Sequence, residues 1–306
     1  MGETKLMGKA FGEEILRRLA ETAEQGYSVS MEKVDKNNGQ KREGIVIRAE
    51  GSRISPVYYL DVMYEQYLQG MSIGDLIEGI WQFYWEEARK KQFDVNDFVD
   101  WSRVKKRLFL RVVSTEMNGV LLETTVHKEM LDLSTVVYVR MEAPADGGVA
   151  SVTVRKEHLA LWQQSEEEVY ELALQNTRQD NITFVSITNA ISAMVSEGER
   201  EMLFGDNPME FDSPLYVLTN EAGHFGAVHM LLPEVMDRIA DEKEEDLYIL
   251  PSSINEIMVL AVSEVHNLSC LREIVQDINE MQVPVEQRLS NHVYRYSKGK
   301  GLAIVA

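Results

Sequence analysis

The sequence of residues 215–253 is LYVLTNEAGHFGAVHMLLPEVMDRIADEKEEDLYILPSS. Its first residues, Leu215 to Leu218, are β-prone, and after a turn rich in Asn and Gly the run Ala227 to Leu232 is predicted to be a second strand. Pro233 suits the first position of a helix, because the donor that proline lacks would have no partner there anyway. A last apolar run before Pro251 predicts a buried strand that ends at this proline. The segment therefore predicts strands alternating with a helix.

Similar units are predicted on the N-terminal side of this segment. The strands Tyr27 to Val34 and Gly44 to Ala49 flank a polar loop with hairpin turn residues, and Thr135 to Met141 pairs with Ala150 to Arg155 around the loop 142–149. Amphipathic helices are predicted between the hairpins, one opened by the capping box of Ser72 and Asp75 and another by that of Ser165 and Glu168. A further helix is predicted over Leu268 to Met281. We therefore expect an α+β protein in which antiparallel β-hairpins are packed by amphipathic helices.

One segment indicates a division of the chain. Residues 196–213 contain Gly198, Gly205 and Pro208 and few periodic apolar positions, which is typical of a linker or long loop. We therefore expect two parts, an N-terminal and central α+β part over residues 1–195 and a C-terminal α+β part over residues 214–306.

The composition is that of a globular chain. It has 306 residues, 44% hydrophobic and 26% charged, and contains no run of the ~18 to 20 apolar residues that a membrane span needs. The N-terminus carries charged residues in place of a signal peptide. Cys270 is the single cysteine, which fits a reducing compartment, and we expect a packed or half-buried thiol there. The expected location is the cytoplasm.

The net charge of −19 is unevenly distributed. Residues 201–306 carry 7 basic and 18 acidic side chains, so this third holds a surplus of 11 negative charges. Such a surface repels nucleic acid and anionic membranes and favours a protein partner with a basic surface. The alternative is that the charge only keeps the protein soluble.

The densest acidic run lies at the predicted end of the helix that Pro233 begins. Its members, Asp241, Glu242, Glu244, Glu245 and Asp246, are the candidate partner-binding residues. They lack the spacing of a calcium-binding loop, and the alternative is a solvated helix end.

Motifs for catalysis and cofactor binding are scarce. The sequence has no phosphate-binding glycine loop, dinucleotide fingerprint or nucleophile elbow, so no cofactor is predicted. Ser252 or Ser253 could form a hydrolase triad with His292 or His229 and Asp246 or Asp212, but triads are defined by geometry, and serines after a strand and a proline also close turns. No histidine pair has helical spacing, and no metal site is predicted.

The most distinctive residues resemble those of a known group. The chain is similar to an uncharacterised family of gut clostridia, of Lachnospiraceae type, which is itself distantly similar to the YtpQ-like proteins of bacilli. The residues that carry this resemblance are Glu157-His158-Leu159, Trp162, Ser165 to Glu168, Glu171 to Ala173, Asn176, Leu215 to Asn220, Gly223, Gly226-Ala227, Pro233, Asp246 to Ile254 and Glu256. The family implies no established activity and no cofactor, a cytoplasmic bacterial origin and an association with mobile genetic elements.

Two positions depart from that family. Asn255 stands where the family frequently has histidine, and Glu234 where it often has glycine. The first departure weakens the hypothesis of a hydrolase in which a histidine beside the paired serines acts as acid or base. The leading hypothesis is therefore a non-enzymatic protein-binding module, in its sharper form an acidic inhibitor of a nucleic-acid-handling enzyme such as a CRISPR effector. A serine-dependent hydrolase using Ser252 or Ser253 and a small-ligand sensor are the alternatives.

Overall fold

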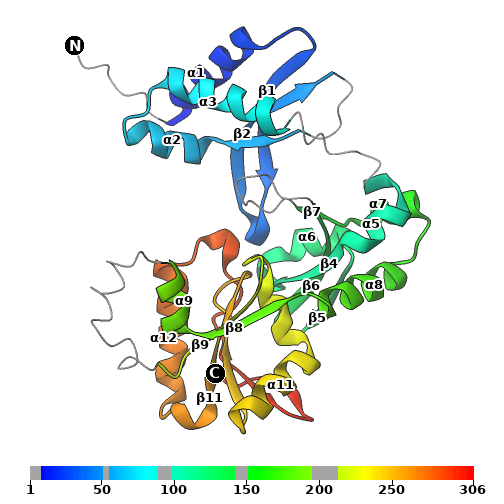
Figure 1. Cartoon of the computed structure of the whole chain (residues 1–306), viewed down its shortest axis with the longest axis vertical. Helices are drawn as coiled ribbons and strands as arrows, with labels where there is room; N and C mark the ends of the chain where they lie inside the picture. Colours follow the sequence, from blue (N-terminus) through cyan, green and yellow to red (C-terminus); the bar gives the residue numbers. More distant parts are fainter. Residues whose placement is uncertain (1–7, 51–54, 89–97, 142–150, 195–212) are drawn as a thin grey trace. The chain divides into compact units, whose positions relative to one another are not determined.

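The computed structural model describes residues 8–50, 55–88, 98–141, 151–194 and 213–306. The chain divides into two compact units. Unit 1 comprises Met1–Val104 and Met141–Ala150, and unit 2 comprises Lys105–Arg140 and Ser151–Ala306. The elements are coloured along the chain in Figure 1. Both units combine helices with antiparallel sheets, which confirms the predicted α+β class.

Unit 1 is a three-stranded antiparallel sheet packed by helices. Its sheet has the order β1-β2-β3, and Tyr27 to Asp35 pairs with Lys41 to Ala49 as the hairpin pattern predicts. The elements are α1 (Gly8–Thr22), β1 (Tyr27–Asp35), β2 (Lys41–Ala49), β3 (Val57–Tyr59), α2 (Leu60–Leu68), α3 (Ile73–Phe83), a π-helical turn η2 (Tyr84–Ala88) and α5 (Trp101–Val104). The capping box of Ser72 and Asp75 opens α3 as predicted.

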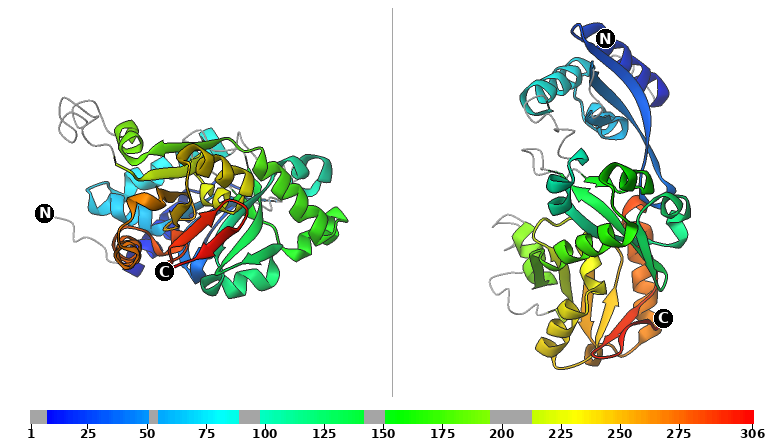
Figure 2. Two further views of the ribbon diagram at one scale, coloured as in Figure 1. Left: turned by 90° about the horizontal axis from the view of Figure 1, so that it is seen from below. Right: turned by 90° about the vertical axis from the view of Figure 1, so that its right-hand side faces the viewer.

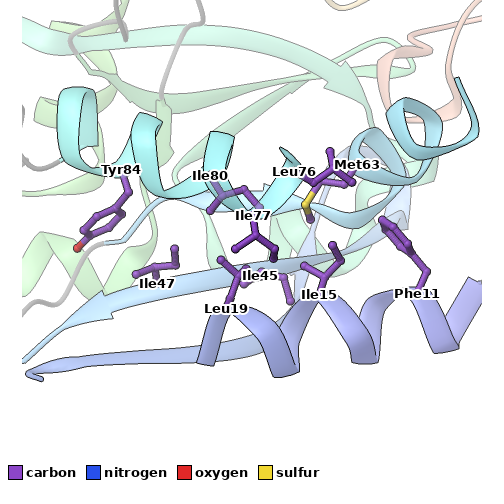
Figure 3. Packing of buried hydrophobic residues seen from close by; sticks show 10 residues of the cluster. All are labelled: Phe11, Ile15, Leu19, Ile45, Ile47, Met63, Leu76, Ile77, Ile80 and Tyr84. Carbon is purple, nitrogen blue, oxygen red and sulfur yellow. The ribbon is translucent and has the colours of Figure 1, made fainter. Parts of the chain in front are cut away.

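The core of unit 1 lies between its three main helices and strand β2. Phe11, Ile15 and Leu19 recur on one face of α1 and are fully buried against Ile45 and Ile47 of β2. Side chains of α2 and α3 close the cluster from above (Figure 3). The spacing of three and four residues on each helix places these apolar groups on one face, so the helices and the sheet stabilise each other.

Unit 2 contains two sheets. In the first, β4 (Leu108–Ser114) and β5 (His127–Met130) flank β6 (Leu133–Arg140), and β7 (Ser151–Thr153) also pairs with β6. The helices of this part are α6 (Gly119–Thr124), α7 (Lys156–Trp162) and α8 (Glu166–Arg178). Helix α8 packs on the sheet, where the hydroxyl of Thr177 accepts a hydrogen bond from the backbone of Leu110 at 2.9 Å.

The second sheet has six strands in the order β13-β12-β10-β11-β9-β8. Its strands are β8 (Ile182–Ser186), β9 (Tyr216–Asn220), β10 (Leu247–Leu250), β11 (Ile257–Ala261), β12 (Tyr294–Ser297) and β13 (Gly301–Ile304). Between them come α9 (Ile187–Met194), a 3₁₀ helix η6 (Gly226–Leu231), α11 (Pro233–Lys243), α12 (Leu268–Met281) and the 3₁₀ turns η7 (Val262–Glu264) and η8 (Val285–Gln287).

Helices α11 and α12 cover opposite faces of this sheet. Leu271 and Val275 of α12 pack against Leu250 and Leu260. On the other face, Tyr296, which lies opposite Leu247 in the ladder, donates a hydrogen bond to Asp237 of α11 at 2.7 Å. Neighbouring residues of a strand point to opposite faces, so Leu247 and Leu250 face different helices. The right-hand view of Figure 2 shows α11 and α12 on the two sides of the strands.

The prediction of a strand over Ala227 to Leu232 is wrong. These residues belong to the 3₁₀ helix η6, which begins after Phe225 turns the chain in the left-handed region, with φ of 57°. Strand β9 already pairs with β8 on one side and with β11 on the other, so no edge is left for a hairpin partner. The apolar run is instead buried as a compact turn of helix.

The compact units divide elsewhere than the sequence indicates. Strand β8 lies before residues 196–213 and strand β9 after them, and the two pair from Ile182 to Ser186. The residues on both sides of this segment thus share one sheet, and the division between units falls at Val104. Residues 196–212 themselves, like the predicted loop 142–149, lie outside the described residues.

Candidate functional site

The paired serines after β10 are part of a turn. Both are buried, and the hydroxyl of Ser253 accepts a hydrogen bond from the backbone of Asn255 at 3.1 Å. The carbonyl of Ser252 accepts one from the backbone of Leu289 at 3.3 Å. These contacts are the ones by which serine closes a turn and joins it to a neighbouring segment.

Asn255 completes the same turn. Its side-chain oxygen accepts a hydrogen bond from the backbone of Phe225 at 3.2 Å, and its carbonyl accepts one from the hydroxyl of Thr219 at 2.8 Å. An amide at this position therefore ties the turn after β10 to the turn after β9. Gly226 makes the approach close, because a Cβ there would lie 2.5 Å from the backbone nitrogen of Asn220.

His292 belongs to a different cluster, centred on the carboxylate of Asp132. His292 Nδ1 lies 2.9 Å from the carboxylate, the hydroxyl of Ser290 donates to it at 2.7 Å, and the hydroxyl of Tyr294 donates to its other oxygen. Burial tends to raise the pKa of Asp132, but these three contacts together hold it below its usual value. Burial, together with the adjacent carboxylate, raises the pKa of Tyr294.

This cluster does not have the geometry of a hydrolase triad. In a triad the carboxylate holds one ring nitrogen and the serine hydroxyl approaches the other. Here the carboxylate and the hydroxyl of Ser290 both lie on the Nδ1 side of His292, the hydroxyl at 3.4 Å. Among the described residues no histidine is hydrogen-bonded to Ser252 or Ser253, and the Nδ1 of His229 lies 2.8 Å from the carbonyl of Gly226. Asp212 lies outside the described residues.

Several carboxylates of the acidic run at the end of α11 are hydrogen-bonded to nearby side chains. Lys298 donates to both oxygens of Asp241 at 2.6 and 2.7 Å. Arg295 and Ser297 donate to Asp246 at 2.7 and 2.6 Å. The hydrogen bonds from Ser297 and Arg295 hold the pKa of Asp246 below its usual value.

The other members of the run differ from one another. Ser263 donates its hydroxyl and its backbone N–H to the carboxylate of Glu245, at 2.7 and 2.8 Å, and thereby lowers the pKa of Glu245. Glu242 and Glu244 are exposed and form no ion pair with any described residue. Within the described structure, three of the five candidate residues, Glu242, Glu244 and Glu245, therefore have no ion pair.

Helix α12 carries a second acidic surface. Glu273, Asp277 and Glu280 lie opposite the buried side chains of Leu271 and Val275 and are exposed. Within the described ranges, none of these three carboxylates forms an ion pair, and the one hydrogen bond to them comes from Gln276 to Glu280, at 3.0 Å along the helix. We call these three residues, with the exposed apolar side chains beside them, the α12 face.

The apolar members of the α12 face are Ile274, 45% exposed, and Met281, 74% exposed. They follow each other at a spacing of seven residues, which on a helix places them in one row beside the carboxylates. A hollow of about 330 Å³ adjoins this face, lined by Ser269, Arg272, Glu273, Gln276 and Ala306. Cys270 lies in the same row and is exposed, which corrects the expectation of a packed or half-buried thiol.

The sequence does indicate this surface, through the spacing of acidic residues along one helix and not through its overall composition. The helix over Leu268 to Met281 is predicted correctly, and its acidic residues at 273, 277 and 280 share the face away from Leu271 and Val275. Comparing the faces of the helix, rather than counting runs of like charge, would find this surface.

Other kinds of site have little support in the described part of the chain. It contains no group of three or more metal-binding side chains. It also contains no helix with the length and apolar character to cross a bilayer.

The fold and surfaces define an acidic α+β protein of two compact units whose most distinctive exposed feature is the α12 face. The chain belongs to a family of unknown function, DUF5688, which matches residues 8–298. No curated protein and no solved structure matches it.

Proposed function

We propose that the protein is a non-enzymatic protein-binding module and that its α12 face binds a basic, amphipathic segment of a partner protein. The observation that supports this is the combination on one helix of three carboxylates without an ion pair among the described residues and a row of exposed apolar side chains. The carboxylates provide orientation and fast association, and burial of Ile274 and Met281 supplies affinity.

The contrast with the end of α11 favours this surface. Asp241 and Asp246 are already hydrogen-bonded to Lys298 and Arg295, so a basic partner would have to displace these contacts. Glu273, Asp277 and Glu280 need no such displacement. A partner cation displaces no ion pair there, and its attraction is reduced by solvent, by salt and by the neighbouring Arg272 of the same helix.

A sharper form of the proposal concerns the class of partner. An acidic surface imitates the charge of a nucleic-acid backbone and can occupy the basic groove of an enzyme that handles nucleic acid, such as a CRISPR effector. The association with mobile genetic elements that the sequence resemblance implies would favour this class. Complex formation should then weaken steeply with salt and should inhibit the enzyme, and the protein itself should not bind DNA or RNA.

A serine-dependent hydrolase receives less support. Ser252 and Ser253 are buried, and within the described ranges neither is hydrogen-bonded to a histidine. A serine-reactive probe should therefore label neither residue.

The single cysteine allows a direct test of the α12 face. A fluorophore on Cys270 should report the addition of a lysine- and leucine-rich amphipathic peptide, with an affinity that falls as salt rises. Replacing Glu273, Asp277 and Glu280 by their amides should weaken binding at least about tenfold, since three attractions of ~0.5 kcal/mol are lost.

The matched control changes the same net charge at the end of α11, through Asp241→Asn, Glu242→Gln and Glu244→Gln. This variant should bind the peptide nearly as well as the unmodified protein. Equal losses in the two variants would show that net charge alone attracts the peptide and would refute a specific α12 face. Unlabelled protein should compete with the labelled protein, which excludes an effect of the fluorophore.

A further inference from the structure

Two arginines from neighbouring strands of the first sheet of unit 2 lie beside the turn that follows β9. Arg140 of β6 forms a bidentate ion pair with Asp180, with N···O distances of 3.0 and 2.7 Å. The Nδ2 of Asn220 donates to the same carboxylate at 3.2 Å. Arg140 therefore has a counterion, and that counterion is itself held in place by the turn.

Arg111 of β4 has a different environment. Its side chain is half-buried, its Nη2 donates to the hydroxyl of Thr153 at 3.0 Å, and its Nε is buried without any hydrogen-bond partner. Among the described residues no carboxylate pairs with it. Burial lowers the pKa of Arg111 to about 10, so the group still carries its charge at neutral pH. Within the described chain, this cation thus has unused donors and no counterion.

The turn after β9 supplies further groups beside this cation. The ring of Phe225 lies 5.2 Å from Cζ of Arg111 and 4.7 Å from the ring of His224. Phe225 adopts a left-handed φ of 57°, which is rare for a bulky residue, and its backbone N–H donates to Asn255, which holds the turn. Within the described part of the chain, the ring nitrogens of His224 form no hydrogen bond.

The electrostatics of His224 agree with this proximity. Burial lowers the pKa of the His224 ring, and the positive charge of Arg111 lowers it further. A neutral imidazole with one N–H remains a donor, so Arg111, His224 and Thr153 offer several donors in one place. No carboxylate of the described chain accepts a hydrogen bond from these donors.

We propose that Arg111 and His224 form the centre of a binding site for an oxyanion, the phosphate or carboxylate group of a small ligand. A guanidinium suits both groups, because its planar fork donates two parallel hydrogen bonds to two oxygens. A half-buried cation without a counterion is unfavourable, and a bound anion removes this cost. The site gives the small-ligand alternative a definite location, on residues other than those of the α12 face.

The first experiment measures thermal unfolding of the full chain with inorganic phosphate, with succinate, and with sodium chloride at matched ionic strength. A ligand that binds only the folded state raises Tm with its concentration. We expect one of the two oxyanions to raise Tm beyond the effect of chloride, and the stronger one identifies the ligand class. Isothermal titration of the same oxyanion gives its Kd.

The matched variants are Arg111→Met and Arg178→Met. Both remove one positive charge, but Arg178, on α8, forms an exposed ion pair with Glu234 of α11. Phosphate stabilises many proteins through exclusion from their surface, and this effect should be equal in both variants. We expect Arg111→Met to lose the specific shift and to bind the oxyanion at least about tenfold more weakly, whereas Arg178→Met should retain both.

Equal Tm shifts in the unmodified protein and in Arg111→Met would overturn the proposal, as would the absence of any oxyanion effect beyond chloride. If Arg111→Met fails to fold, Arg111→Lys keeps the charge and removes the fork. That variant should bind more weakly than the unmodified protein, and unchanged binding would refute the bidentate site. None of these outcomes depends on whether α12 binds a partner.

Discussion

The substitution Asp132→Ala should destabilise unit 2 more than removal of an exposed carboxylate such as Asp277. Asp132 follows a left-handed residue, Leu131, in the turn between β5 and β6, and its three donors come from the chain 158 to 162 residues later. The carboxylate therefore ties the first sheet to the segment that leads into β12. Alanine at this position leaves Ser290, His292 and Tyr294 without their shared acceptor.

The expected loss of stability in Asp132→Ala follows from the exposure of the three donors. The side chain of His292 is 40% exposed, so water replaces its lost contact at little cost. Tyr294 is fully buried, and its hydroxyl is left without an acceptor at a cost of ~1 to 3 kcal/mol. With the loss of a charge-assisted bond from Ser290, the total is about 3 kcal/mol. Asp132→Asn retains one acceptor oxygen and should cost about half as much.

Hydrogen exchange followed by mass spectrometry tests this prediction, because it reports the protection of amides in unit 2 separately from that in unit 1. Amides of β12 and of the β5–β6 turn should lose protection together in Asp132→Ala, since the tie joins them. The control Asp277→Ala removes an exposed carboxylate that has no ion pair within the described ranges, and it should change stability by less than ~0.5 kcal/mol. A loss below about 1 kcal/mol in Asp132→Ala would refute the reasoning.

Three further predictions concern other parts of the chain. Gly226→Ala should cost about 2 to 3 kcal/mol, measured by urea unfolding, because its Cβ would meet the backbone of Asn220 at 2.5 Å. Ile15→Ala, at a fully buried position of unit 1, should cost about 3 kcal/mol and reduce exchange protection in unit 1 while leaving unit 2 unchanged. Asp132 and Asp246 have lowered pKa values in the folded state, so their stabilisation is complete above the usual carboxyl pKa and is lost as pH falls through the folded values. Stability should therefore decrease in acid, and Asp132→Asn should show a shallower decrease below about pH 4 when urea unfolding is repeated across pH.

The local elements were predictable because their signals are local. The capping box of Ser72 and Asp75 and that of Ser165 and Glu168 open α3 and α8, and helix α12 has the predicted bounds, Leu268 to Met281. The hairpin of β1 and β2 follows from alternating residues around a polar turn. Each of these depends on interactions within a few residues of the chain.

The order of strands in the second sheet was not predictable in the same way. Ala227 to Leu232 has the composition of a strand, but the neighbours of β9 are β8 and β11, from before and after it in the chain. Which edge is free depends on these distant pairings, and no local pattern contains them. The same holds for Asp132, whose partners lie 160 and 162 residues away at His292 and Tyr294.

The candidate binding residues show that the density of acidic residues in the sequence does not predict which carboxylates lack ion pairs in the fold. The run Asp241 to Asp246 has the highest density of acidic residues, but Lys298 and Arg295 reach it from β12 and the turn beyond. Glu273, Asp277 and Glu280 are more widely spaced and form no ion pair among the described residues. Whether a carboxylate can bind a partner depends on which cations the tertiary fold places beside it, and the local sequence does not contain this information.

The two arginines beside the turn after β9 differ for the same tertiary reason. With 50 acidic and 31 basic residues, the chain has carboxylates in excess, and the fold supplies one to Arg140 through Asp180. Arg111, on the neighbouring strand, receives none from the described chain and keeps an unpaired Nε in a buried place. A shortage of anions in the sequence therefore cannot explain why no described carboxylate pairs with it. A binding site for an external anion does explain it, and the comparison of Arg111→Met with Arg178→Met decides between that account and an arginine that is tolerated only for packing.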